Sequence, residues 1–129
     1  MKAKFISIGK GLSIAILCLG IIHEIATFTP LIQDGLERLS KSNFDAMIYM
    51  SLMCGASLVL NGLLLLLLLK KIETHSFFAY PILIISTFIL ISGVTAITFM
   101  IGNPFAWIVF ALGLSITLIA IKLRKAALG

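Results

Sequence analysis

Four long apolar stretches occupy most of this chain and decide what it can fold into. They run over residues 11–32, 46–69, 77–100 and 105–123. Each approaches or exceeds the roughly 20 residues that a helix needs to cross a bilayer. A segment in hydrocarbon must satisfy its own backbone hydrogen bonds, so each stretch is predicted to be a helix. The sequence therefore predicts an all-α polytopic membrane protein, a four-helix transmembrane bundle in which residues 1–129 form a single integral membrane domain.

The low charge content supports the same conclusion. Hydrophobic residues make up 60% of the chain and charged residues 12%, whereas a soluble domain carries about 25% charged residues. The formal net charge is +5, but the basic residues lie at the ends of apolar segments rather than on a folded face. The charge therefore does not indicate a nucleic-acid partner. The predicted partner is the lipid bilayer.

The positions of lysine and arginine predict how the chain sits in the membrane. Basic residues collect on the cytoplasmic side. With the N-terminus inside, that side holds eight of the ten: Lys2, Lys4, Lys10, Lys70, Lys71, Lys122, Arg124 and Lys125. The outer side holds Arg38 and Lys41. Both termini are therefore predicted to be cytoplasmic.

The beginning of the chain also has features of a signal peptide, with lysines before the apolar residues 11–22. No small-x-small cleavage site follows, because Ala26 would need a small residue at the position of Glu24. We therefore expect the first span to be retained.

The loops differ in length. The loop over residues 33–45 is charged, and Leu36, Leu39 and Phe44 are spaced so that it forms either a short amphipathic surface helix or a solvated linker. Between the third and fourth spans, Gly102 and Asn103 suit a tight turn, and Pro104 can begin the next helix.

Polar residues within the spans mark the candidate site. His23 and Glu24 stand side by side in the first span, with Thr27 one turn later. Ionisable side chains at this depth are costly and usually face the bundle interior or a cavity. Adjacent helical residues point about 100° apart, so Thr27 bridges the faces of the other two. With Asn61 of the second span and Ser92 of the third, these are the candidate ligand-binding residues.

Two interpretations of this polar layer are open. In the structural one, His23 and Glu24 hydrogen-bond to Ser57, Asn61 or Ser92 and fix the packing of the helices. In the functional one, they line a small cavity that takes a ligand, an ion or a proton.

Catalytic and cofactor motifs are missing from the sequence. The segment HEIAT at His23 lacks the second histidine of HExxH, and no phosphate-binding loop, GxSxG or CxxCH motif occurs. The sequence predicts no metal site and no cofactor. Nothing in it supports an enzyme, although an acid–imidazole pair in the membrane leaves that question open.

Several short motifs follow one another in the chain: Gly20-x-x-His23, the segment PLIQDG ending at Gly35, the glycines 55 and 62, and GNPFAW at the start of the fourth span. Together they resemble a group of uncharacterised small bacterial integral membrane proteins with four spans and a DoxX-like architecture. Glu24 is not a feature of that group. The resemblance implies the fold and a bacterial cytoplasmic (inner) membrane location, and it implies no activity.

Three functions are compatible with the sequence. The first is binding of an apolar or lipid-like ligand, or of a partner protein or second copy, at the polar layer. The second is proton-coupled export, because a single glutamate in the first of four spans is similar to the small multidrug exporters. Those proteins are shorter and carry aromatic positions that this chain lacks. The third is regulation by helix–helix contact alone.

Overall fold

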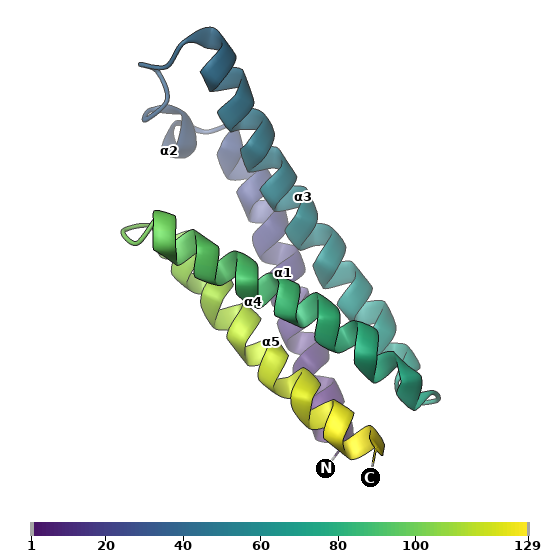
Figure 1. Cartoon of the computed structure of the whole chain (residues 1–129). Helices are drawn as coiled ribbons and strands as arrows, with labels where there is room; N and C mark the ends of the chain where they lie inside the picture. Colours follow the sequence, from purple (N-terminus) through teal and green to yellow (C-terminus); the bar gives the residue numbers. More distant parts are fainter. Residues whose placement is uncertain (1, 129) are drawn as a thin grey trace.

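The protein is all-α, as predicted. The computed structural model describes residues 2–128, and these contain no strand. Four helices are long and apolar enough to cross a membrane. In chain order, the elements in Figure 1 are α1 (Lys2–Thr27), α2 (Pro30–Gln33), α3 (Lys41–Lys71), the 3₁₀ turn η1 (Ser76–Phe78), α4 (Ala79–Phe99) and α5 (Pro104–Leu128).

The first span ends earlier than expected. Helix α1 stops at Thr27, because Pro30 disfavours helical geometry in the residue before it, and Thr29 is extended (φ −107°, ψ 160°). Pro30 then begins the single turn α2. The following loop contains turns rather than an amphipathic helix, and it ends where Ser40 caps α3 by accepting a hydrogen bond from the Asn43 backbone.

The four long helices form two antiparallel hairpins, one of α1 with α3 and the other of α4 with α5. Glycines permit close approach in both. A methyl group added at Gly62 of α3 would lie 2.7 Å from the backbone nitrogen of Leu17 in α1. One added at Gly113 of α5 would lie 2.8 Å from the Cα atom of Leu90 in α4. Small residues at helix interfaces are the usual means of tight packing in membranes.

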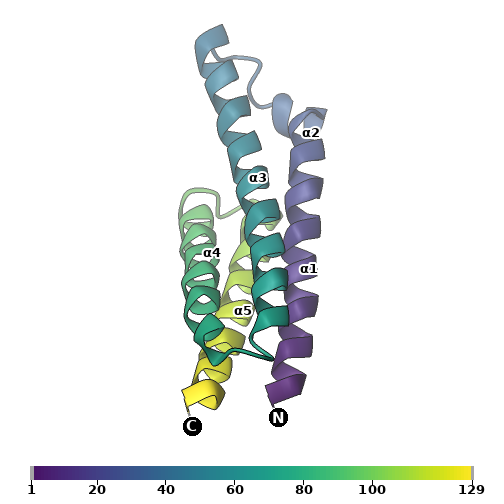
Figure 2. The same cartoon turned by 90° about the vertical axis from the view of Figure 1, so that its right-hand side faces the viewer.

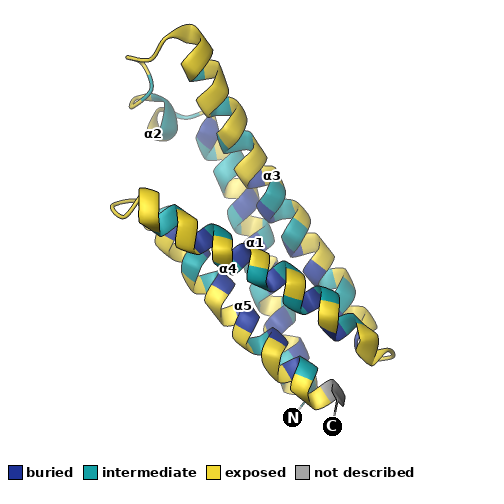
Figure 3. Cartoon of the chain, viewed as in Figure 1, coloured by how far each residue is buried: buried dark blue, intermediate teal, exposed yellow. Residues whose placement is uncertain are grey.

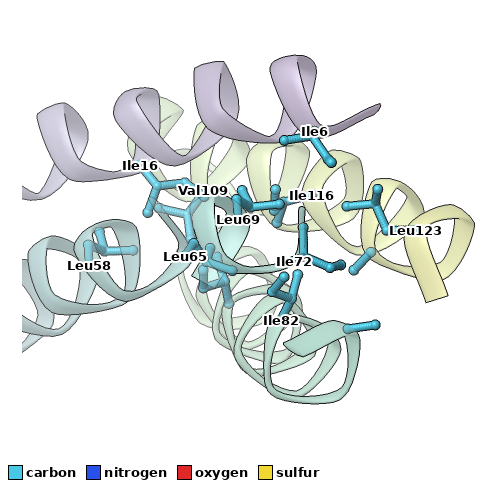
Figure 4. Close-up of a cluster of buried hydrophobic side chains, with 13 residues drawn as sticks. Ile6, Ile16, Leu58, Leu65, Leu69, Ile72, Ile82, Val109, Ile116 and Leu123 are labelled. Carbon is cyan, nitrogen blue, oxygen red and sulfur yellow. The ribbon is translucent and has the colours of Figure 1, made fainter. Parts of the chain in front are cut away.

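The hydrophobic core extends from Ile6 and Leu123, near the two ends of the chain, to Leu58 and Val109 farther along the bundle (Figure 4). All four long helices contribute to it, and its fully buried members include Ile16, Leu65, Leu69, Ile82 and Ile116. The outer surface of the bundle is also apolar. Figure 3 shows exposed residues along every long helix, and large side chains such as Ile22 and Ile84 are more than half exposed. An apolar surface of this extent requires an apolar surrounding, which the bilayer provides.

The hairpins separate toward the end of the bundle where α2 lies (Figure 1). Helix α3 has 31 residues and α4 has 21, which at 1.5 Å per residue gives lengths of about 46 and 32 Å. The α1–α3 hairpin consequently extends past the turn between α4 and α5 (Figure 2). In that turn Asn103 accepts a hydrogen bond from the backbone of Phe105, and α5 begins at Pro104 as expected.

Candidate functional site

A cavity of about 380 Å³ lies between the two hairpins in the half near α2. Its walls come from residues 47–61 of α3, the second half of α4, the start of α5, and His23 of α1, with Ile32 of α2 and Leu36 of the following loop. Most of the lining is aliphatic, aromatic or sulfur-containing, and no lining residue carries a formal charge. Met50 of α3 and Phe88 of α4 line the cavity yet are 63% and 52% exposed. The cavity therefore opens toward the surroundings between α3 and α4.

His23 joins the two hairpins at the wall of this cavity. Its ring stacks on Phe105 of α5, with ring centroids 4.3 Å apart and an angle of 26° between the planes. Within its own hairpin, its Nε2 atom lies 3.1 Å from the hydroxyl oxygen of Ser51 in α3. The imidazole thus connects α1 with both α3 and α5.

Ser51 and Thr27 complete a short hydrogen-bonded chain. The two hydroxyl oxygens are 2.7 Å apart, and the Thr27 hydroxyl also donates to the backbone carbonyl of His23 at 2.9 Å. Thr27 is fully buried. Among buried residues, such a chain satisfies polar groups that would otherwise be costly.

Ser51 was not among the residues predicted from sequence, and the expected hydrogen-bond partners of His23 were wrong. The helices pair so that Leu17 lies against Gly62 and Glu24 against Gly55. In this antiparallel register Asn61 lies opposite residue 18 and Ser51 opposite residue 28, so each is five residues or about 7.5 Å along α1 from His23. The His23 side chain reaches Ser51 and not Asn61. Sequence depth estimates place residues only by their distance along each helix, so they could not supply the direction of the side chain.

Asn61 and Ser92 line the same cavity as His23 but make only local hydrogen bonds. The Asn61 amide donates to the backbone carbonyl of Ser57 at 2.8 Å and to its hydroxyl oxygen at 3.2 Å. The Ser92 hydroxyl donates to the carbonyl of Phe88 at 2.9 Å. These side chains therefore add polarity to the walls without tying the helices to one another.

Glu24 lies outside the cavity. Its carboxyl group contacts Gly55 in the interface between α1 and α3, where a larger side chain at position 55 would displace it. The Oε1 atom is buried and has no hydrogen-bond partner among the described residues. Of the five predicted site residues, three line the cavity: His23, Asn61 and Ser92. Thr27 lies behind His23, and Glu24 faces α3.

No protein-family model, curated protein or solved structure matches this chain. What the site can do must therefore be argued from its own chemistry. Within residues 2–128, no group of three His, Cys, Asp or Glu side chains is arranged to hold a metal ion. His75 lies far from the cavity, exposed in the loop after α3, where its Nδ1 atom is 2.8 Å from the Thr74 hydroxyl. The arrangement that remains is an apolar cavity with a few uncharged hydrogen-bonding groups.

Proposed function

We propose that this chain is a small integral membrane protein of the bacterial cytoplasmic membrane that binds a lipid-like molecule between its two hairpins. The cavity carries this proposal. Its volume of about 380 Å³ lies within the range of roughly 300–1,000 Å³ that is typical of small-molecule sites. Such sites are mostly apolar and have a few placed polar groups, which here are His23, Ser51 and Asn61.

A lipid-like occupant fits the position and the chemistry of the cavity. The opening between α3 and α4 is on a surface that faces hydrocarbon, so a molecule can enter sideways from the bilayer. The lining offers no formal charge to bind a charged head group. It offers apolar walls for an acyl or isoprenoid chain and a hydrogen-bonding corner at His23 and Ser51 for a hydroxyl or carbonyl group. With both termini cytoplasmic, the occupant comes from the outer leaflet.

The test is to fill the cavity and measure what co-purifies. In the Ser92→Phe variant a ring occupies the cavity, and we expect the bound lipid seen by native mass spectrometry and lipid extraction to be lost. Thr95→Phe is the matched control, because Thr95 lies on the same helix, is exposed and makes the same kind of local hydrogen bond. Equal lipid content in the two variants would refute the proposal. A dimer or a co-purified protein in place of a lipid would indicate another occupant.

Proton-coupled export is the second candidate. An exporter of the small multidrug kind needs its acid in contact with the substrate, whereas Glu24 contacts Gly55 and does not line the cavity. We therefore favour binding over export. The Glu24→Gln variant separates the two, because binding predicts an unchanged lipid content. Export predicts that proton movement driven by a cationic substrate in proteoliposomes is abolished.

A further inference from the structure

Soft donor atoms collect in the cavity. The chain has five methionines, two cysteines and two histidines. Three of these methionines, one cysteine and one histidine line this single cavity: Met47, Met50, Met100, Cys54 and His23. They come from α3, from the residue that follows α4, and from α1. A composition bias in one segment therefore does not explain why they meet.

We propose that Met47, Met50 and Cys54 of α3, together with His23, form a binding site for a soft monovalent metal cation, for which Cu(I) is the biological example. Thioether and thiolate sulfur select Cu(I) over harder cations, and imidazole also suits copper. This inference rests on the cavity and not on the lipid-like ligand.

The helical spacing brings these donors together. Met47 and Met50 are three residues apart, and Met50 and Cys54 are four apart, so each pair consists of neighbours on the helix surface. Methionine has three rotatable bonds and adapts its sulfur position readily. Ser51, the residue after Met50, lies 3.1 Å from the Nε2 atom of His23. The imidazole therefore lies beside the same stretch of α3.

Charge balance favours a monovalent ion. No lining residue is acidic or basic, and Cys54 is a free thiol. When Cys54 loses its proton to the solvent and one monovalent cation binds, the net charge of the site does not change. A divalent ion would add a second positive charge that no lining residue compensates, which is costly inside the membrane. Zinc-type ligation has no support either, because the described residues contain no trio of His, Cys, Asp or Glu side chains.

The chain supplies a matched control for each kind of donor. Met53 is on α3 but does not line the cavity. Cys18, the other free cysteine, is on the exposed surface of α1. His75 lies outside the membrane-spanning helices.

Competition with the chromophoric chelator bicinchoninate measures Cu(I) binding by the purified full chain in detergent under reducing conditions. We expect one Cu(I) per chain. The double variant Met47→Leu/Met50→Leu and the single variant Cys54→Ser should each lower the affinity for Cu(I) by more than ~10-fold. A loss of ~10-fold is what removal of a residue that only supports a metal ligand can cause. Leucine conserves the volume of methionine, so this substitution costs little stability in packed sites. Circular dichroism verifies the fold of each variant.

Met53→Leu, Cys18→Ser and His75→Ala should leave the affinity unchanged. The proposal is overturned if the chain does not compete with the chelator, if the control variants weaken binding as much as the cavity variants, or if Cys54 alone accounts for binding. Lipid content is measured on the same samples. Lipid without Cu(I) binding would overturn this inference alone, and Cu(I) binding without lipid would leave it standing.

Discussion

Replacing Gly62 with alanine should force α1 and α3 apart. The added methyl carbon would lie 2.7 Å from the backbone nitrogen of Leu17 and 2.9 Å from its Cα atom. Carbon atoms in contact prefer separations of about 3.5–4.0 Å. Since both obstructing atoms are backbone, no side-chain rotation can relieve the collision, and the two helices must separate by about 1 Å.

The expected cost follows from two opposing effects. Overpacking of a well-packed interface costs about 1–3 kcal/mol, and alanine offsets about 1 kcal/mol of this because it is the better helix former. Gly11 of α1 isolates the second effect, since no atom lies within 4 Å of a methyl group added there. The difference in the free energy of unfolding between Gly62→Ala and Gly11→Ala is therefore expected to be about 1–3 kcal/mol.

Reversible unfolding in mixed micelles, followed by circular dichroism, measures this difference. Gly62→Ala should unfold at a lower denaturant concentration than the wild type, and Gly11→Ala should not. If the two variants are equally stable, α1 and α3 do not approach at Gly62, and the close packing of these two helices is wrong.

Three further predictions concern polar contacts. Ser51→Ala removes the hydrogen-bond partner of His23 and should lower the free energy of unfolding, measured in the same way, by about 0.6–2 kcal/mol. An unchanged free energy of unfolding would mean that this hydroxyl does not help to hold α1 against α3. Thr117→Val removes a 2.9 Å bond to a carbonyl of α4 and should cost about as much, with a loss confined to α4–α5 contacts in hydrogen exchange. Lys10 donates to Glu73 at 2.8 Å and lowers the pKa of that carboxyl. The stabilisation is therefore present at neutral pH and disappears as the pH falls through the lowered pKa, so Glu73→Gln should remove this acid dependence; an identical pH profile would contradict it.

The sequence was sufficient for the fold class because hydrocarbon allows few alternatives. Four apolar stretches of span length predicted four helices, and the structure confirms them. The turn at Pro104 was also predictable, since proline suits the first turn of a helix. The predicted end of the first span, at residue 32, was wrong, because Pro30 restricts the preceding residue to an extended conformation and the helix ends at Thr27.

The site was only partly predictable. Helical position gives depth, and His23, Asn61 and Ser92, which the sequence places at similar depths, line one cavity in the structure. Which residues touch depends on helix register and rotation, which apolar runs do not encode. Ser51 was missed for that reason, and Glu24 lies toward Gly55 rather than the cavity. The spacing of Met47 and Met50 was visible in the sequence, but methionine at helical spacing gives no signal until the opposite wall is known.

The most direct test of the account is to detect lipid chains inside the cavity. Methyl groups of Leu58, Ile89 and Val109 line the cavity although each is at most 5% exposed, whereas Leu65 and Ile116 are fully buried in the core. Nuclear Overhauser effects between lipid acyl chains and labelled methyl groups in nanodiscs distinguish the two sets. The account predicts lipid contacts at Ile89 and Val109 and none at Leu65 and Ile116. The absence of nuclear Overhauser effects from lipid to the methyl groups of Ile89 and Val109 would contradict it.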